Sequence, residues 1–373
     1  MMILLAILTL LMFTYRIVIR SANKHLMGIH NYSAQGMSHA SVTVVVAARN
    51  EEDHIIRCLN SILLQKHGFE NLEIIVVDDQ SSDKTAEIVG GFQDRGVRLI
   101  QIGSGEKVFG KKAAIARGIA EASNNIIVTS DADCIFPDTW LNTLVSFKEK
   151  TDAVFVAAPV MFRKELNLLE KFQSLDFLSL QGITASAVNS NQFNMCNGAN
   201  LLYTKEAFNM VNGFEGIDHI ASGDDMLLME KIGKAFPGRI KYCYSKDAIV
   251  ITEPAASLKL FFQQRIRWAS KAGSYSNLWI KLILLNVFLV NVGLLAVFIA
   301  GFFDPYYFSA CGFFMLLKII IEMPFMVRTA RFFKKTKLIR WFIPSQPFHV
   351  LYTLIAASFG MVTTYTWKGR KLK

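Results

Sequence analysis

The chain has 373 residues, of which 52% are hydrophobic and 19% charged, with a formal net charge of +10 and a mean hydropathy of +0.32. This hydropathy excludes an ordinary soluble protein, and the length allows a domain of about 250 residues together with membrane segments. The positive charge is compatible with nucleic acid binding. However, no nucleic-acid-binding motif accompanies it, and the basic residues cluster beside apolar segments, so we expect no nucleic acid partner.

An apolar and uncharged run opens the chain and is followed by the basic residues Arg16, Arg20 and Lys24. The run has no basic residues before it and no small-residue cleavage site. Residues 1–20 are therefore expected to form a retained transmembrane anchor rather than a signal peptide. Because positive charge favours the cytosolic side of a membrane, the domain that follows is expected to face the cytosol.

Short β-branched runs then alternate with helical stretches. The expected strands are 42–46, 72–77, 97–102 and 126–130, and the expected helices are 51–64, 83–92 and 112–122. Near-continuous apolar strands separated by helices predict an α/β domain with a mostly parallel sheet covered on both faces. We assign residues 41–256 to this domain. Ligands of such sheets bind beyond the carboxyl ends of the strands.

The second half of the domain is expected to contain helices at 166–188 and 225–235, a polar and glycine-punctuated stretch at 194–200, and a strand at 248–252. After the domain, residues 257–277 include a basic amphipathic helix. A helix with this pattern lies in the membrane interface, so it is expected to rest on the bilayer surface.

Three apolar stretches follow, at 278–303, 306–327 and 342–365. Each is long enough, at about 1.5 Å per residue, to cross a hydrocarbon core of about 30 Å. Residues 278–365 are therefore predicted to be a C-terminal transmembrane region, and residues 366–373 form a basic tail. The basic residues between 328 and 340 predict contact with anionic lipid.

These spans leave one conflict. If the basic residues at 16–24 and 328–340 are both cytosolic, a fourth full span places the basic tail outside, against the positive-inside rule. Pro344 and Pro347 offer an alternative, in which the last segment is partly re-entrant.

Asp131 and Asp133 follow the strand expected at 126–130. Aspartates two apart point to the same side of an extended backbone, so they can share one divalent cation. Mg²⁺ and Mn²⁺ favour carboxylate and phosphate oxygens, which suits a nucleoside diphosphate. Turn formation and helix capping are the alternatives for a single such motif, but Asp78 and Asp79 end a parallel strand at the same edge and favour the metal-bound nucleotide.

Two further motifs could contact the nucleotide. Asp79 could accept hydrogen bonds from a base or ribose, whereas Ser82 or Asp83 could instead cap the next helix. Lys111 and Lys112 open a helix and could meet phosphate or base, although they could equally be solvated surface lysines.

Asp224 and Asp225 precede the helix expected at 225–235. A free aspartate has a pKa near 3.9, but a neighbouring carboxylate and partial burial are expected to raise that pKa and favour a role as general base. The alternative is a pair of acids that stabilises the helix N-terminus.

Gln264, Arg267 and Trp268 lie three and four residues apart, on one face of the amphipathic helix. Arginine can pair with a diphosphate and tryptophan can stack on a sugar or base. The alternative is an interfacial helix with an aromatic anchor.

With these motifs in this order, residues 42–271 resemble the membrane-bound family 2 glycosyltransferases, which are inverting enzymes with a GT-A fold. The resemblance implies that Asp131 and Asp133 bind Mg²⁺ or Mn²⁺, with Asp225 as the catalytic base. The implied donor-binding residues are Ala48, Glu51, Asp79, Lys112, Asp131, Gln264, Arg267 and Trp268, and the implied acceptor-side residues are Gly198, Ala199, Asn200 and Asp224. The chain departs from the family in lacking a proline before Ala48 and in having Asp224 where the family has glutamate.

The resemblance implies an enzyme, a hexosyl- or N-acetylhexosaminyltransferase, which moves one sugar from a nucleotide-sugar donor, expected to be a UDP-sugar. The expected acceptor is a lipid or lipid-linked glycan at the bacterial cytoplasmic membrane, because processive synthases usually have more helices than the roughly four spans here. The alternatives are a processive polysaccharide synthase subunit and a non-catalytic membrane scaffold that binds nucleotide-sugars.

Overall fold

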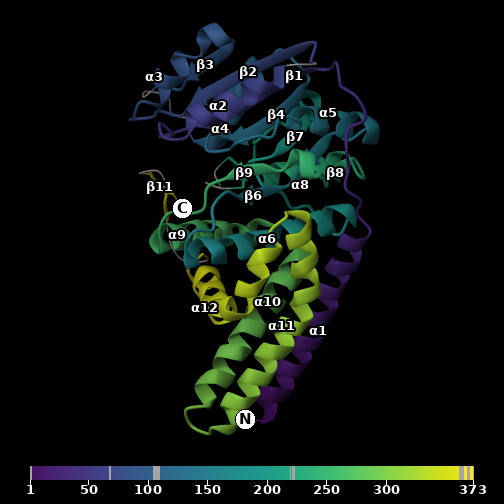
Figure 1. Cartoon of the computed structure of the whole chain (residues 1–373), viewed down its shortest axis with the longest axis vertical. Helices are drawn as coiled ribbons and strands as arrows, with labels where there is room; N and C mark the ends of the chain where they lie inside the picture. The colour runs from purple at the N-terminus through teal and green to yellow at the C-terminus, as the bar shows by residue number, and fades with distance from the viewer. Residues whose placement is uncertain are drawn as a thin grey trace.

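The computed structural model describes residues 2–66, 69–103, 110–218, 220 and 223–360, and the backbone of 365–367 and 370–372. It contains an α/β domain and a group of long helices that extends from one end of that domain (Figure 1). Helix α6 runs between these two parts.

The centre of the domain is a seven-stranded sheet with the strand order β3-β2-β1-β4-β7-β5-β8. Its strands are β1 (Ser41–Ala48), β2 (Asn71–Asp78), β3 (Val97–Gln101), β4 (Ile126–Asp131), β5 (Phe155–Ala157), β7 (Leu201–Thr204) and β8 (Ile240–Tyr242). All neighbouring pairs are parallel except those of β7, which runs antiparallel to β4 and β5. The expected mostly parallel α/β sheet is confirmed. The strands β6 (Val160–Phe162) and β9 (Val250–Thr252) form a separate parallel pair.

Helices cover both faces of the sheet because its central strands are apolar on both sides. The covering helices are α2 (Ile55–Leu63), α3 (Thr85–Gly90), α4 (Lys111–Glu121) and α5 (Trp140–Thr151). Gly118 of α4 marks the closest approach, since a Cβ there would lie 2.4 Å from Cγ1 of Val45 in β1. The predicted helix 51–64 begins later than expected because a turn at residues 52–54 precedes it.

Three further helices lie in the second half of the domain. They are α6 (Leu168–Asn189), α7 (Lys205–Met210) and α8 (Met226–Ala235), of which α6 and α8 contribute residues to the site. The side chain of Asn167 caps α6 by accepting a hydrogen bond of 2.9 Å from the backbone of Glu170. Helix α6 contacts both the strands β6 and β8 and the long helices α1 and α11, and so joins the two parts of the molecule.

Within the described residues, three helices are long and apolar enough to cross a membrane: α1 (Met2–Met27), α10 (Leu278–Ala300) and α11 (Tyr306–Phe332). They pack against one another along their length. Gly293 of α10 allows close packing, because a Cβ there would lie 2.8 Å from Cδ1 of Leu8. The N-terminal end of α1 and the turn between α10 and α11 lie at the end of the bundle far from the domain (Figure 1).

The last apolar segment differs from the expected span. It forms α12 (Phe342–Gly360), which is not among those three helices and packs on the amphipathic helix α9 (Leu258–Ala269) beside the domain (Figure 1). Its polar residues Gln346 and His349 and the internal Pro347 explain its lower hydropathy. The backbone strands β10 (Tyr365–Trp367) and β11 (Arg370–Leu372) follow, with β10 in contact with α9. The last apolar segment thus packs beside the domain, and the re-entrant alternative for it stays a prediction.

Candidate active site

A cavity of about 940 Å³ extends from the carboxyl ends of β1 and β4 to the membrane helices. Every predicted site residue except Lys112 and Asn200 lines it. Its volume lies at the upper end of the range for small-ligand sites. The topology therefore brings together acids that are far apart in the chain, from Glu51 to Asp225.

The donor edge of the cavity is formed by the turns that follow β1 and β2. Ala48, Glu51 and Asp79 all line this edge. Asp79 is buried, and its Oδ1 accepts a hydrogen bond of 3.0 Å from the backbone of Gly110. Asp78 instead accepts a hydrogen bond from the backbone of Ser81 at 3.2 Å. Of the two strand-end acids, only Asp79 lines the cavity.

Asp131 and Asp133, at the end of β4, could hold a divalent cation. Both line the cavity, and Oδ2 of Asp133 accepts a hydrogen bond of 3.0 Å from the Thr252 hydroxyl. In the described part of the chain, no group of three or more His, Cys, Asp or Glu side chains is arranged to hold a metal. Two carboxylates fit Mg²⁺ or Mn²⁺ if diphosphate oxygens and water supply the remaining ligands.

Lys111 joins the two acidic parts of the site. Its Nζ lies 2.6 Å from Oδ1 of Asp131 and 3.0 Å from Oδ2 of Asp224. Burial alone lowers the pKa of an amine, but Asp131 and Asp224 more than offset this effect and raise the pKa of Lys111 well above its usual value. Lys111 therefore stays charged and partly neutralises both acids.

The structure distinguishes Lys111 from the predicted donor contact Lys112. The ammonium of Lys112 donates hydrogen bonds to the backbone carbonyls of Ile217 and Ile220, and its side chain does not line the cavity. Consecutive residues point about 100° apart around a helix, so one turn of α4 presents only one of these lysines to the cavity. The geometry favours Lys111 as the residue that meets the donor.

Asp225 is the N-cap of α8. Its Oδ1 accepts a hydrogen bond of 2.7 Å from the backbone of Met226, and its Oδ2 accepts one of 3.2 Å from the backbone of Gly198. Nζ of Lys271 lies 3.4 Å from Oδ1. Asp225 thus caps α8, as the helix-stabilising alternative predicts, and it also lines the cavity.

The expected rise in the pKa of Asp225 is wrong for this arrangement. Burial does raise this pKa, but the ammonium groups of Lys271 and Lys111 lower it by more, so it lies below its usual value. The neighbouring Asp224 pairs with Lys111 instead. Asp225 is therefore ionised at neutral pH.

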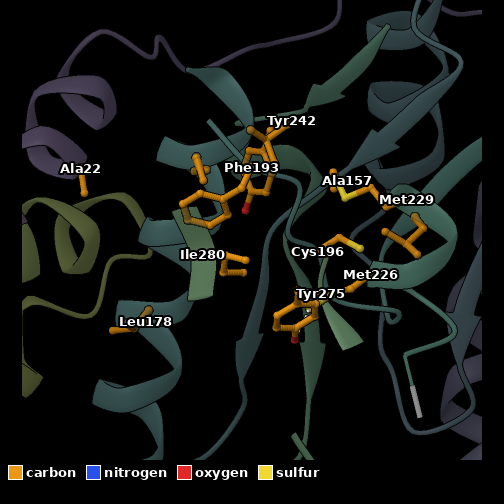
Figure 2. Packing of buried hydrophobic residues seen from close by; sticks show 14 of the residues in the cluster. Ala22, Ala157, Leu178, Phe193, Cys196, Met226, Met229, Tyr242, Tyr275 and Ile280 are labelled. Carbon is orange, nitrogen blue, oxygen red and sulfur yellow. Dashed lines mark hydrogen bonds between the residues drawn. The ribbon is translucent and has the colours of Figure 1, made fainter. Parts of the chain in front are cut away.

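Apolar and aromatic side chains gather at the start of α8, next to Asp225 in the chain. Cys196, Met226 and Tyr275 are buried there, near Ile280 of α10 (Figure 2). The Tyr275 hydroxyl donates a hydrogen bond of 3.4 Å to the sulfur of Met226. All three side chains line the same cavity as Asp225.

The glycine-punctuated stretch contributes Gly198 and Ala199 to the cavity. A Cβ on Gly198 would lie 2.9 Å from Nζ of Lys111 and 3.3 Å from Oδ2 of Asp224, so only glycine allows this approach without displacing the ion pair. Asn197, which the sequence motifs did not identify, also lines the cavity.

The predicted acceptor-side residue Asn200 has a structural position instead. It is fully buried, donates hydrogen bonds of 2.8 Å to the carbonyls of Pro159 and Ala248, and accepts one of 2.9 Å from Nε1 of Trp140. Its amide is occupied by contacts between strands and loops. Asn200 therefore does not line the cavity.

Helix α9 presents Gln264, Arg267 and Trp268 to the cavity. The neighbouring Arg265 is buried, and its guanidinium lies 4.2 Å from the centroid of the Trp268 ring and 2.7 Å from Oδ2 of Asp176 in α6. Sequence reasoning missed Arg265 and Asp176. The available signal was a lone aspartate within the otherwise uncharged stretch 172–180.

Comparisons with known proteins agree with this geometry. The family model described as Glycosyl transferase family 2 matches residues 43–210. Residues 43–210 are therefore similar to a glycosyl transferase family 2 domain. This domain contains Asp79, Lys111, Asp131 and Asp133, whereas Asp225 and helix α9 lie after the matched residues.

Curated proteins similar to this chain include poly-beta-1,6-N-acetyl-D-glucosamine synthases. The protein from Staphylococcus aureus (strain MSSA476) is 29% identical over 236 residues, which are 61% of this chain and 53% of that protein. The protein from Staphylococcus epidermidis (strain RP62A) is 27% identical with the same coverage. The chain thus spans about half the length of these curated relatives.

Among solved structures, the mannosyltransferase PcManGT from Pyrobaculum calidifontis, in complex with GDP-Man and Mn²⁺, has a TM-score of 0.60 and 18% identity. The match covers 96% of this chain and 98% of that one. At this identity the likeness concerns the fold, and it extends beyond the family 2 domain to the membrane helices.

Proposed function

We propose that this protein is an inverting, metal-dependent glycosyltransferase that moves one sugar from a nucleoside diphosphate sugar to a lipid or lipid-linked glycan acceptor. A UDP-sugar is the proposed donor, and hexose or N-acetylhexosamine is the proposed sugar. The proposal assigns donor binding to the turns after β1 and β2, to Lys111 and to the motif on α9. It assigns proton abstraction to Asp225.

One observation carries the proposal. The carboxylates of Asp131 and Asp133 and the carboxylate of Asp225 line the same cavity, at the carboxyl edge of the sheet. Lys111 joins the two groups through ion pairs with Asp131 and Asp224. A donor diphosphate held at the first group would place its sugar toward the second, where a base is needed.

The proposed reaction is a single displacement. The acceptor hydroxyl oxygen forms a bond to the anomeric carbon while the bond from that carbon to the diphosphate oxygen breaks. The hydroxyl proton passes to Asp225, and the electron pair of the broken bond leaves with the nucleoside diphosphate. Attack from the side opposite the leaving group inverts the anomeric configuration, and such proton transfer contributes about 10²–10⁴-fold to the rate.

The leaving diphosphate carries negative charge that the site must stabilise. A Mg²⁺ or Mn²⁺ ion held by Asp131 and Asp133 would supply positive charge and polarise the phosphate oxygens when bound. Arg267 and Lys111 line the same part of the cavity and can pair with phosphate directly. Trp268 offers a flat face on which the sugar or base can stack.

We place the protein in the bacterial cytoplasmic membrane with the domain in the cytosol. Arg16, Arg20 and Lys24 lie toward the domain end of α1, and Arg328 and Arg331 lie toward the domain end of α11. Positive charge on this side fits the positive-inside rule and contact with anionic lipids. The anchor, the domain, the interfacial helix and the C-terminal region keep their predicted boundaries in this proposal.

A processive polysaccharide synthase is the second candidate, and the curated relatives named as poly-beta-1,6-N-acetyl-D-glucosamine synthases favour it. The two candidates differ in their product. A single transfer yields one added sugar, whereas a synthase yields a ladder of lengths.

The test uses the full-length protein reconstituted in liposomes. A panel of nucleotide-sugars with Mg²⁺ or Mn²⁺ is read first by release of nucleoside diphosphate and then by mass analysis of lipid products. We expect one donor to be turned over and the Asp225→Asn variant to lose about 10²-fold or more of this activity. Donor binding without diphosphate release by the wild type would indicate a scaffold, and near-normal transfer by a folded Asp225→Asn variant would exclude this base.

A further inference from the structure

The cavity has a second arm that the donor site does not use. Beyond Asp225 it continues between α6, α10, α11 and α12, at the level of the membrane helices. Along α10 its lining runs from Ile280 to Phe288, a depth of about 12 Å at the rise of an α-helix. The arm thus joins the proposed catalytic base to the bilayer level.

The walls of this arm are mainly apolar. They include Ile183 of α6, Ile283 and Val287 of α10, and Phe325 and Met326 of α11. Ile283 and Val287 are only half-buried, as expected for side chains that face open space within a bundle. Such walls give little stabilisation to hydroxyl groups and suit a hydrocarbon chain.

The inner end of the arm is a polar cluster whose members satisfy one another. Nζ of Lys318 lies 2.7 Å from Oε1 of Glu322 and donates to Oε1 of Gln346 at 2.6 Å. Gln346 donates to Oε2 of Glu322 at 3.1 Å, and the Tyr15 hydroxyl donates to the same carboxylate. The ion pair of Lys318 and Glu322 is neutral overall. This end of the arm is therefore closed by groups that do not need a charged ligand.

Beyond this cluster the bundle is tightly packed. Leu8 and Val290 are fully buried and Met12 and Leu294 are nearly so, and Leu8 occupies the space left by the glycine at position 293. None of these residues lines the cavity. In the described part of the bundle, the arm therefore ends within the membrane rather than passing through it.

We infer that this arm holds the hydrocarbon chain of the acceptor, which is a membrane lipid with a hydroxyl group in its head. The hydrocarbon chain of the lipid lies between α6, α10, α11 and α12, and the hydroxyl group of its head reaches Asp225. The inference rests on the proposed function, because it takes Asp225 as the base. It specifies a lipid acceptor, since a closed apolar arm fits a chain end better than a polymer in transit.

The test uses a substitution on α10 that narrows the arm. Ile283→Trp adds a bulky ring to the wall, whereas the neighbouring Leu282→Trp is the matched control, because Leu282 is 46% exposed and does not line the cavity. Both variants and the wild type are reconstituted in liposomes. Each is assayed with a long-chain and a short-chain alkyl glycoside that have the same sugar head.

The readout is the ratio of kcat/KM for the long-chain acceptor to that for the short-chain acceptor. Partition of each acceptor into the bilayer is the same for all three proteins, so differences in this ratio report the arm itself. We expect Ile283→Trp to lower the ratio about tenfold or more through overpacking, and Leu282→Trp to leave it unchanged. An equal ratio in all three proteins would overturn the inference.

A second measurement does not depend on transfer. A lipid with a photoreactive group in its chain should label α10 in the wild type and in Leu282→Trp, and label it less in Ile283→Trp. If no acceptor supports release of nucleoside diphosphate from the donor, the proposed function fails. The labelling pattern then shows independently whether the arm binds a lipid chain. Equal labelling of α10 in the wild type and in Ile283→Trp would contradict the proposal that the lipid chain binds in the arm.

Discussion

Asp225 lies between the ammonium groups of Lys271 and Lys111, and these two cations decide its charge state. Lys271 comes from the segment after α9, and Lys111 opens α4, so neither is a sequence neighbour. A base with a lowered pKa is always ionised at neutral pH, at the cost of weaker basicity. Displacement of either lysine by the donor or acceptor would make Asp225 more basic at the moment of reaction.

The first prediction concerns the pH profile of Lys271→Met. In the wild type, the pKa of Asp225 is below its usual value of about 3.9, so its protonation should not reduce activity between pH 8 and pH 5. Burial raises the pKa of Asp225, and Lys271 opposes this effect. Removal of Lys271 therefore raises the pKa of Asp225. We therefore expect the acidic limb of kcat/KM to move to higher pH in the variant.

The buried thiol of Cys196, the Tyr275 hydroxyl and the Lys111 ammonium do not produce such a limb. Burial raises the pKa of Cys196 and Tyr275, and the pKa of Lys111 is also raised. The matched control is Lys259→Met, because Lys259 is exposed on α9 and does not line the cavity. A profile for Lys271→Met that coincides with both wild type and control would refute this electrostatic role.

At the scale of elements, α9 is attached to the core of the protein by a buried ion pair. Arg265 and Asp176 are 2.7 Å apart with side chains only 4% and 3% exposed, and the Tyr352 hydroxyl of α12 donates to the same aspartate. The Arg265 guanidinium also packs against Phe261 and Trp268. The motif on α9 is therefore held in place by α6 and α12.

The second prediction tests this attachment with Asp176→Asn. Removing one partner leaves the Arg265 charge buried and unpaired, which should reduce the free energy of unfolding by about 3 kcal/mol. Denaturant unfolding in detergent measures this change. Donor binding should also weaken, because the Trp268 ring loses the support of a fixed guanidinium.

A surface ion pair supplies the control for this experiment. Arg98 and Glu121 are 2.5 Å apart but half and one-third exposed, so Glu121→Gln should change stability by less than about 0.5 kcal/mol. A change in Asp176→Asn as small as in this control would show that the buried pair does not stabilise the protein.

At the scale of the whole molecule, three helices that are long and apolar enough to span a membrane form one bundle on one side of the domain. Helix α1 enters the domain from the bundle, and α10 and α11 leave and return (Figure 1). Helix α12 packs on α9, and the backbone of β10 also contacts α9. If α1, α10 and α11 cross the membrane and α12 does not, the described backbone of 365–367 and 370–372 lies on the same side as the domain.

The third prediction follows from this topology. A tag fused after Lys373 should be cleaved by protease only from the side of the membrane that exposes the catalytic domain. A cysteine in place of Asp304, in the turn between α10 and α11, should react with an impermeant reagent only from the opposite side. Cleavage of the tag from the side that labels position 304 would mean that α12 crosses the membrane.

The sequence by itself determined the alternation of strands and helices, the membrane segments and the order of the acidic motifs. These features depend on local pattern: β-branched runs form buried strands, apolar stretches of sufficient length enter a membrane, and acids at strand ends meet at one edge of a parallel sheet. The positions of Asp79, Asp131, Asp133 and Asp225 in one cavity follow from that order.

Only the tertiary structure decided which neighbour of each motif faces the cavity and what charge surrounds it. Lys111 rather than Lys112 points inward, Asn200 joins strands, and Lys271 and Lys111 reverse the expected shift in the pKa of Asp225. The direction of a side chain depends on helix phase, and a pKa depends on the distances to charges from remote segments. Neither quantity is encoded in the local pattern, so both required the packed fold.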